Sequence, residues 1–241
     1  MKETIMDLHQ IAQMIDLSAV QTENDETYVR KLVDTAINVN CIAVFTLPSW
    51  ILFTKSLLGS GTRILLGGPV GFPAGGNTTK SKVFETCELI KMGCSEIDVV
   101  INVGKLLSGH YKEVYDDIRA VVEAADKAPV KVIIECHYLS EKDILKSCDI
   151  VIESGASWVK TGTGWTATGA TVENIRLISD HVGNQVKIKA AGGIRDLATL
   201  LQLYNLGARR FGLGLNSALS IIDELTKKEL EEYPTTLKVQ P

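Results

Sequence analysis

The sequence has no Cys-x-x-Cys pair, and its cysteines form an odd set of five: Cys41, Cys87, Cys94, Cys136 and Cys148. This usage favours reduced thiols over a disulfide framework and argues against a zinc site. The four histidines (9, 110, 137 and 181) are also scattered, and only His137 adjoins a predicted strand end. We therefore expect a cytoplasmic protein without a metal centre.

Long apolar runs and an excess of basic charge are missing as well. No stretch approaches the roughly 20 apolar residues needed to cross a bilayer. The N-terminal MKETIMDLHQ lacks the apolar core of a secretory signal. The 25 Lys and Arg face 29 Asp and Glu, a net charge of −4, so no basic patch for nucleic acid is expected. We expect small-molecule partners rather than nucleic acid or a membrane.

Short apolar runs alternate with longer amphipathic segments along the 241 residues. Strands are predicted at 14–18, 41–46, 63–69, 96–102, 130–135, 158–161, 187–191 and 209–213. Helices are predicted at 25–39, 48–59, 79–93, 110–127, 141–154, 171–182, 196–206 and 216–232. This alternation predicts parallel strands with helices outside, and a single (β/α)8 TIM-barrel domain spanning 1–241 is the preferred fold. A doubly wound open sheet is the alternative, because periodicity does not reveal whether a sheet closes.

Ionisable side chains lie at or near the ends of four predicted strands. Asp98 lies in EIDVVIN, Glu135 ends VKVIIE, Lys160 ends WVK, and Lys189 lies in KIKAAGGIRD. One such residue alone would be interpreted as a solvated rim residue. Independent placement explains four of them poorly, and barrel active sites gather where strands end. We therefore predict that these residues share one site.

The two lysines on consecutive strands indicate a specific chemistry. A lysine attacks a carbonyl only as the free amine, and an ordinary lysine pKa of about 10.4 makes that form scarce at neutral pH. A second ammonium nearby, together with partial desolvation, lowers that pKa and exposes the nucleophile. Asp98 could then shuttle protons during imine formation. Lys160, Lys189 and Asp98 are the apparatus of a Schiff-base aldolase.

The segments WVKTGTGW (158–165) and KAAGGIRD (189–196) resemble the Schiff-base and second-lysine segments of the deoxyribose-phosphate aldolase family. GFPAGGNTTKSKVFE (71–85), EIDVVINVG (96–104) and KVIIE (131–135) also match the family, in its order and spacing. The resemblance covers nearly the whole chain. It implies a (β/α)8 class I aldolase without metal or organic cofactor, acting in carbohydrate metabolism and deoxyribonucleotide catabolism. Its substrate would be a small aldehyde or sugar phosphate, and its assembly a homo-oligomer, a dimer or tetramer.

The family's functional residues carry over onto matching positions of this sequence. Lys160 would form the Schiff base, Lys189 would lower its pKa, and Asp98 would relay protons. Lys187 competes with Lys189 by spacing, but the motif favours Lys189, which directly precedes the Ala-Ala-Gly-Gly turn. The glycines of that turn could cradle a phosphate at a helix N-terminus. The expected substrate- and phosphate-binding residues are Asp16, Ser18, Gly164, Gly192, Gly193, Gly212 and Gly214.

The sequence departs from the family around the substrate. Gly214 and Leu215 stand where the family has hydroxyls, and Trp165 stands where some members have lysine. Phe45 and Leu47 occupy positions that are commonly Cys and Asn. The expected reaction is the reversible cleavage of 2-deoxy-D-ribose 5-phosphate to glyceraldehyde 3-phosphate and acetaldehyde. Another sugar, sugar phosphate or carbonyl donor is the close alternative, because the rim has lost polar groups while the catalytic residues are intact.

Functions of other classes remain open from the sequence. A phosphosugar isomerase or lyase could use Asp98 and Glu135 for proton transfer without a covalent bond, and a non-catalytic barrel could simply bind a small ligand. The scattered histidines disfavour a metal-dependent aldolase. Tyr233 is not in register with the C-terminal tyrosine of some family members, so we expect no role for it.

Overall fold

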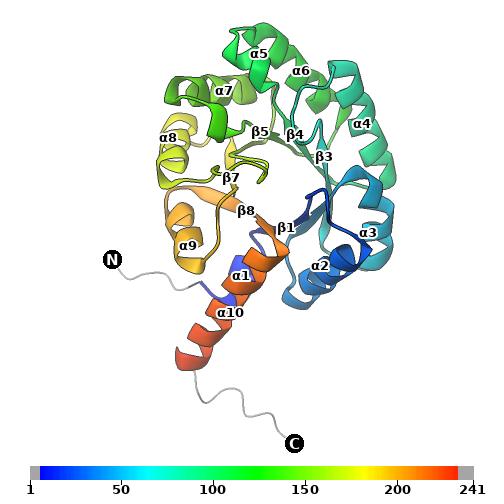
Figure 1. The fold of residues 1–241 in the computed structure, drawn as a ribbon, viewed down its shortest axis with the longest axis vertical. Helices are drawn as coiled ribbons and strands as arrows, with labels where there is room; N and C mark the ends of the chain where they lie inside the picture. Colours follow the sequence, from blue (N-terminus) through cyan, green and yellow to red (C-terminus); the bar gives the residue numbers. More distant parts are fainter. Residues whose placement is uncertain (1–5, 233–241) are drawn as a thin grey trace, which may run out of the picture.

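Eight parallel strands close into a barrel in the computed structural model, which describes residues 6–232 (Figure 1). The strands are β1 (Ile15–Ala19), β2 (Ala43–Thr46), β3 (Leu65–Val70), β4 (Glu96–Val100), β5 (Val130–Ile133), β6 (Trp158–Lys160), β7 (Lys187–Ala191) and β8 (Ala208–Gly214). Each strand pairs with the next in the chain, and β8 pairs with β1 to complete the ring. The TIM-barrel prediction is confirmed, and the open doubly wound sheet is excluded.

Helices surround the ring of strands (Figure 1). They are α1 (Leu8–Ala12), α2 (Glu26–Val39), α3 (Ile51–Leu58), α4 (Thr79–Met92), α5 (Val103–Leu107), α6 (Tyr111–Ala124), α7 (Glu141–Glu153), α8 (Val172–Val182), α9 (Leu197–Asn205) and α10 (Leu215–Glu232). Two single turns, η1 (Pro48–Trp50) and η2 (Cys136–Tyr138), follow β2 and β5. Within residues 6–232, no helix has the length and apolarity required to cross a membrane.

The helix α2 illustrates how local sequence produces each outer element. The Asp25 side chain accepts a hydrogen bond from the Tyr28 N–H at 2.8 Å and so caps the first turn. Val29, Leu32, Val33 and Ala36 recur at helical spacing, and all four are buried. The helix ends at Asn40, whose φ of 54° is left-handed. Caps and apolar stripes of this kind let the helices pack with one face on the barrel.

Two strands end two residues earlier than the sequence pattern predicts. The predicted strand 96–102 stops at Val100, and Asn102 instead caps α5 by accepting a hydrogen bond from Lys105 N–H at 3.1 Å. The predicted strand 130–135 stops at Ile133. Glu135 then adopts a left-handed φ of 55°, so it belongs to the loop that follows β5. Both changes occur at the end of the barrel where the charged side chains gather.

Candidate active site

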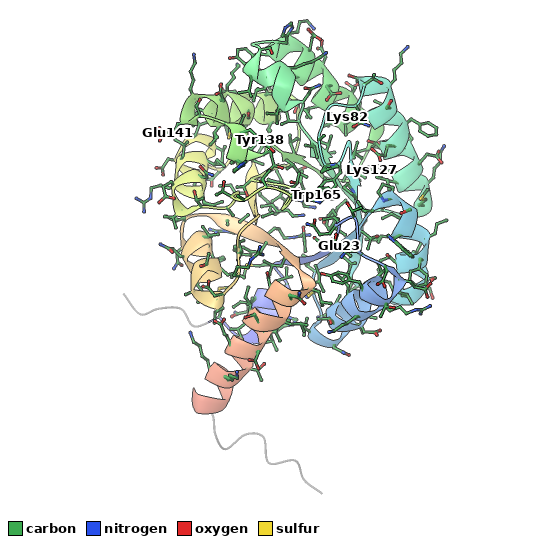
Figure 2. The ribbon with its side chains drawn as sticks, in the orientation of Figure 1. Glu23, Lys82, Lys127, Tyr138, Glu141 and Trp165 are labelled. Carbon is green, nitrogen blue, oxygen red and sulfur yellow. The ribbon has the colours of Figure 1, made fainter. Side chains whose placement is uncertain are left out.

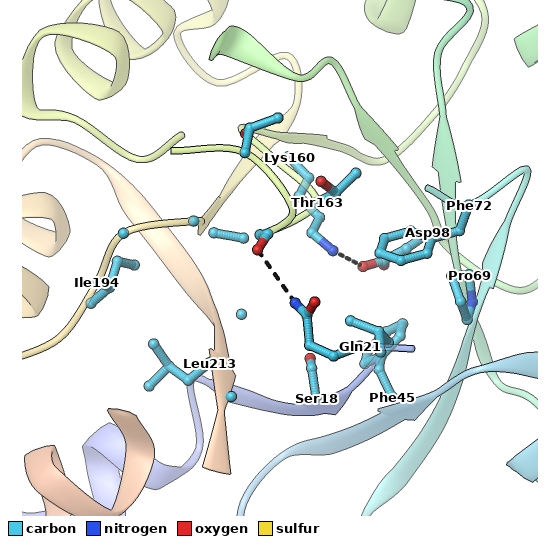
Figure 3. Close-up of a pocket in the computed structure, with 18 of the residues that line it drawn as sticks. Ser18, Gln21, Phe45, Pro69, Phe72, Asp98, Lys160, Thr163, Ile194 and Leu213 are labelled. Atoms are coloured by element: carbon cyan, nitrogen blue, oxygen red, sulfur yellow. Dashed lines mark hydrogen bonds and ion pairs between the residues drawn. The ribbon is translucent and has the colours of Figure 1, made fainter. Parts of the chain in front are cut away.

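A cavity of about 160 Å³ opens at the C-terminal ends of the strands (Figure 3). Most of the site residues predicted from the sequence line it, namely Ser18, Asp98, Lys160, Gly164, Gly192, Gly193, Gly212 and Gly214. The barrel therefore brings together residues that lie as far apart in the sequence as Ser18 and Gly214. Asp16 and Lys189 do not line the cavity and lie beneath it.

Lys160 is the last residue of β6, and its ammonium group faces a carboxylate rather than open solvent. Lys160 Nζ donates to Asp98 Oδ2 at 2.8 Å, and the residue is only 7% exposed. The pKa of Lys160 is lowered to about 8, because burial lowers it more than the Asp98 carboxylate raises it and the Lys189 ammonium adds to the lowering. Lys160 can therefore lose its proton near neutral pH, as a nucleophilic lysine must.

Asp98 lies on β4 in the same part of the barrel and accepts from two lysines through one oxygen. Its Oδ2 atom is 2.8 Å from Lys160 Nζ and 2.7 Å from Lys189 Nζ. Burial alone would raise the pKa of Asp98, but the ammonium groups of Lys160, Lys189 and Lys131 outweigh burial and hold it well below its usual range. Oδ1 of Asp98 is buried, accepts no hydrogen bond from the described residues, and lies 3.6 Å from Lys131 Nζ.

Lys189 is fully buried below the cavity, where β7 packs between β6 and β8. Its Nζ atom is 2.7 Å from both Asp98 Oδ2 and Asp16 Oδ2. Burial lowers the pKa of Lys189, yet the two carboxylates raise it above its ordinary value. Lys189 is therefore held as a cation beside Asp98. Lys187, the competing lysine, is exposed, with its ammonium 5.2 Å from the Trp158 ring centroid.

The sequence analysis placed Asp16 among the substrate-binding residues, and in the structure it lies beneath the cavity. Asp16 is fully buried and lines no part of the cavity. It pairs with Lys189 and with Arg210, whose Nε donates to Asp16 Oδ1 at 2.7 Å. Burial raises the pKa of Asp16, but Lys189, Lys131 and Arg210 outweigh it and lower the pKa below its usual value. Asp16 thus acts on the cation that neighbours Lys160.

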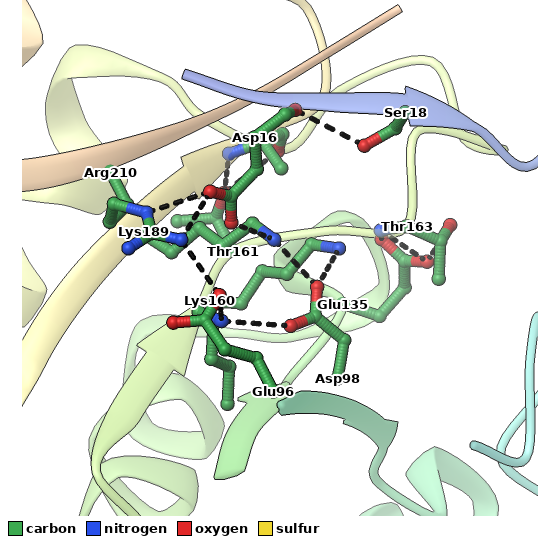
Figure 4. Close-up of polar contacts among 12 residues, drawn as sticks. Asp16, Ser18, Glu96, Asp98, Glu135, Lys160, Thr161, Thr163, Lys189 and Arg210 are labelled. Carbon is green, nitrogen blue, oxygen red and sulfur yellow. Dashed lines mark hydrogen bonds and ion pairs between the residues drawn. The ribbon is translucent and has the colours of Figure 1, made fainter. Parts of the chain in front are cut away.

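Below the cavity, six buried side chains of alternating charge contact one another in a closed circuit, which we call the charge ring. Figure 4 labels all of its members except Lys131. In order around the circuit they are Asp98, Lys189, Asp16, Arg210, Glu96 and Lys131. The sequence analysis missed Glu96, Lys131 and Arg210. A signal for them exists, because each is a charged residue in a strand that is mostly apolar, and Glu96 is two residues from Asp98, on the same strand face.

Glu135 supports the loop after β6 rather than the charge ring. It accepts from the Thr163 hydroxyl at 2.5 Å and the Thr166 hydroxyl at 3.2 Å. The Thr163 N–H also points at this carboxylate, 3.3 Å from each oxygen. A Cβ on Gly162 would stand 2.9 Å from Glu135 Oε1. Glu135 therefore holds the segment that follows Lys160, and glycine at 162 gives it room.

Two loops from different parts of the barrel meet over the cavity. Trp165 Nε1 donates to the Val20 carbonyl at 2.9 Å. Gln21 Nε2 donates to the Gly164 carbonyl at 3.4 Å (Figure 3). The Trp165 ring also packs edge to face on Phe72, with centroids 5.9 Å apart. Figure 2 shows Trp165 near the middle of the ring of strands. We call the two hydrogen bonds between the loop after β1 and the loop after β6 the loop bridge.

The opposite side of the cavity is polar and includes a cation that the sequence analysis did not single out. Arg195 lines the cavity beside Gly192 and Gly193, and its Nη1 donates to the Ser217 hydroxyl at 3.1 Å. Gly192 and Gly193 have φ values of 90° and 93°, a conformation that side chains other than glycine rarely adopt. Leu215 is buried in the first turn of α10, and its N–H donates to the Tyr28 hydroxyl at 3.2 Å.

Metal ligands are not gathered at this site or elsewhere in residues 6–232. No three of the His, Cys, Asp and Glu side chains there are grouped so that they could hold an ion. Burial raises the pKa of the Cys41, Cys94 and Cys148 thiols to about 12 and raises that of the Cys136 thiol well above its usual range, so these thiols are poor nucleophiles.

Comparison with known sequences identifies relatives over most of the chain. Residues 5–216 match the model of the DeoC/LacD family aldolase. A deoxyribose-phosphate aldolase of Klebsiella pneumoniae is 48% identical over 229 residues, which are 94% of this chain and 91% of that protein. A deoxyribose-phosphate aldolase of Rhizobium meliloti is 44% identical over 88% of this chain and 86% of its own.

Solved structures agree with these sequence relatives. The aldolase QR15 superposes with a TM-score of 0.86 at 32% identity, covering 94% of this chain and 99% of that one. A tetrameric deoxyribose phosphate aldolase from Aeropyrum pernix superposes with a TM-score of 0.84 at 25% identity, covering 92% and 93% of the two chains. The similarity therefore extends over the barrel and its site, not over one motif alone.

Proposed function

The chain belongs to the DeoC/LacD family of aldolases, and from this premise we propose that it cleaves its substrate through a Schiff base on Lys160. As an aldolase it is a carbon–carbon lyase. The reaction is the reversible cleavage of 2-deoxy-D-ribose 5-phosphate to glyceraldehyde 3-phosphate and acetaldehyde, the activity that the names of its relatives indicate. The observation that supports the proposal most directly is the buried Lys160 amine, 2.8 Å from Asp98 in a cavity of about 160 Å³.

The reaction begins with the free amine of Lys160. This amine attacks the aldehyde carbon of the open-chain substrate and forms a carbinolamine, which loses water to become the imine. The Asp98 carboxylate, which lines the cavity beside Lys160, transfers the protons that the attack and the dehydration require, directly or through water. Lys189 remains a cation throughout, because both of its carboxylate partners stabilise its charge.

Cleavage then uses the imine as an electron sink. Removal of a proton from the substrate's 3-hydroxyl breaks the bond between C2 and C3, and the electron pair moves into the enamine on Lys160. Glyceraldehyde 3-phosphate leaves, the enamine is protonated at C2, and water releases acetaldehyde and free lysine. Asp98 is the acid–base group nearest to Lys160 in the cavity and serves these proton transfers.

The phosphate end of the substrate lies on the side of Arg195. One guanidinium and the backbone of Gly192 and Gly193 line that side of the cavity, whereas Gly214 offers no hydroxyl. Phe45 and Phe72 line the remaining wall. These groups support a weaker preference for phosphorylated substrates than a rim rich in lysine and serine would give.

Reductive trapping tests the proposed function. Borohydride with acetaldehyde should add one ethyl group irreversibly to the peptide that contains Lys160. Lys160→Met should abolish both labelling and cleavage, while Lys187→Met, a matched exposed lysine, should leave both intact. Labelling on Lys187 or Lys189 would overturn the assignment. Cleavage without any trapped adduct would favour the non-covalent isomerase or lyase.

A homo-oligomer is part of the same proposal. The Aeropyrum pernix relative is tetrameric, and large apolar side chains are exposed on three consecutive helices here: Ile37 on α2, Leu52 on α3 and Phe84 on α4. Such side chains are costly in water and common at subunit interfaces. Light scattering at micromolar concentration should give the mass of a dimer or tetramer, and the mass of one chain would contradict this.

A further inference from the structure

The charge ring is closed, and its charges alternate without interruption. Asp98 contacts Lys189, Lys189 contacts Asp16, and Asp16 contacts Arg210, each pair at 2.7 Å. Arg210 Nη2 and Lys131 Nζ both donate to Glu96 Oε2 at 2.7 Å. Lys131 Nζ completes the circuit 3.6 Å from Asp98 Oδ1. All six members are at least nine-tenths buried.

The formal charges of the ring cancel, which affects the protonation of Lys160. Its three carboxylates, Asp16, Glu96 and Asp98, are matched by the three cations Lys131, Lys189 and Arg210. Lys160 joins this neutral set only through Asp98, which already serves two ring cations. A protonated Lys160 is therefore a seventh charge, without a carboxylate of its own, in a region of low dielectric. A buried charge without its own partner is disfavoured relative to its neutral form.

We propose that Lys131 and Glu96 are positioning residues that act through Asp98, so that Lys160 loses its proton more readily than a lysine with its own carboxylate. This inference rests on the proposed function and deepens it. The Lys131 cation shares Asp98 and leaves less of that negative charge for Lys160. Glu96 in turn holds Lys131 and Arg210 and limits how strongly they draw on Asp98 and Asp16.

No other titratable group in the described barrel interrupts this circuit. The cavity-lining residues of β2 and β3 are Phe45 and Pro69, which carry no charge. The Phe45 ring lies 4.0 Å from Lys189 Nζ and 4.9 Å from Lys131 Nζ, and so covers two of the ring cations. Glu135, beyond the end of β5, directs its oxygens to Thr163 and Thr166 instead.

Removing one charge at a time separates electrostatics from structural support. Lys131→Met deletes a cation that shares Asp98, so the Asp98 carboxylate stabilises the Lys160 ammonium more strongly. The pH midpoint of imine formation should therefore move upward by about one unit. Glu96→Gln deletes an anion but keeps an acceptor for Lys131 and Arg210, and should move the midpoint downward by roughly half a unit or more. The double variant deletes one charge of each sign and should return the midpoint toward the wild type.

The measurement is the rate of reductive ethylation of Lys160 by acetaldehyde and cyanoborohydride between pH 6 and pH 10, followed by peptide mass. Lys82→Met is the matched control, because Lys82 is equally buried and paired with Asp117 at 2.6 Å, outside the ring. It should weaken folding without moving the midpoint. Arg210→Met carries the same upward expectation as Lys131→Met and replaces it if that variant does not fold.

Opposite shifts in the two single variants support the proposal. Shifts of the same sign, or unchanged midpoints beside normal wild-type labelling, would overturn it and leave the proposed function standing. Absence of labelling on Lys160 in the wild type would instead overturn the proposed function. The two failures are therefore distinguishable within one series.

Discussion

At the scale of single residues, the lowered pKa that suits Lys160 for imine formation should also make the folded protein less stable. Its folded pKa of about 8 lies below the unfolded value of about 10.4. Between those values the unfolded chain binds more protons, so stability should rise with pH through this window. Lys160→Met removes the buried charge and should stabilise the fold by about 1–3 kcal/mol at pH 7. Urea unfolding should show that gain shrinking toward pH 10, and a gain independent of pH would contradict the linkage.

Asp98 should set both the pH midpoint of imine formation and the rate of cleavage. Asp98→Asn removes the carboxylate that favours the Lys160 ammonium, so the pH midpoint for trapping should move downward. It also removes the proton-transfer group, so kcat for cleavage should fall by about 100-fold or more. Trapping and steady-state kinetics on the same preparation measure both effects. Equal losses in both assays at every pH would indicate a merely structural role.

The residues that sequence reasoning recovered are those that belong to a motif. Lys160, Lys189 and Asp98 were found from strand position and chemistry before any contact was known. Lys131 and Arg210 were missed because a lone charge inside a strand has no local partner in the sequence. Their partners come from strands distant in the chain: Arg210 meets Asp16 and Glu96 only once β8 lies beside β1.

At the scale of elements, the loop bridge should control substrate choice. It sets Trp165 against Phe72 over the cavity, at a position where some family members have lysine. Trp165→Lys should raise the ratio of kcat/KM for glyceraldehyde 3-phosphate to kcat/KM for glyceraldehyde by about 10-fold. This is the discrimination expected from one charge-assisted hydrogen bond to the phosphate. Trp165→Phe keeps an aromatic ring without the bond to Val20 and should leave the ratio near that of the wild type.

The wild-type ratio itself tests how the phosphate is held. Arg195 is the cation that lines the cavity beside the glycine turn, so we expect a preference for the phosphorylated aldehyde well below a thousandfold. A ratio of a thousandfold or more would show that Arg195 and Ser217 replace the hydroxyls missing at Gly214 and Leu215. Steady-state kinetics in the synthesis direction with acetaldehyde measures this ratio.

Element types could be predicted from the sequence better than element ends. Periodicity located the strands and the major helices, because burial imposes period 2 or 3.6 on apolar residues. It placed the end of β4 too late, since Asn102 follows an apolar run yet caps α5. It likewise extended β5 to Glu135, whose left-handed backbone depends on contacts with Thr163 and Thr166 from another loop. Such contacts are tertiary and leave no local signal.

At the scale of the whole molecule, closure of the barrel creates the site. Alternation of strands and helices predicts parallel pairing, but it contains no information on whether the last strand meets the first. The pairing of β1 with β8 sets Asp16 opposite Gly212. An added Cβ at Gly212 would stand 3.3 Å from Lys189 Cε, so the absence of a side chain there lets Lys189 pass toward Asp98. An open sheet of the same strands would not complete the charge ring.

Because the buried carboxylates are deprotonated in the fold, the molecule should unfold in acid through the charge ring. The pKa values of Asp16 and Asp98 are lowered in the folded protein, whereas unfolded aspartate has a pKa of about 3.9. Below about pH 3.9 the unfolded chain binds protons at these aspartates while the folded protein does not. Their contribution to the free energy of unfolding is therefore complete above this pH and is lost as the pH falls.

Asp16→Asn should lower the free energy of unfolding at pH 7, since Lys189 and Arg210 lose a partner. It should also make the loss of stability in acid, which we call the acid limb of the stability curve, less steep. Urea unfolding between about pH 3 and pH 6 measures that limb, with Asp34→Asn as an exposed control that should leave its slope unchanged. Parallel curves for the wild type and Asp16→Asn would mean that acid unfolding starts elsewhere.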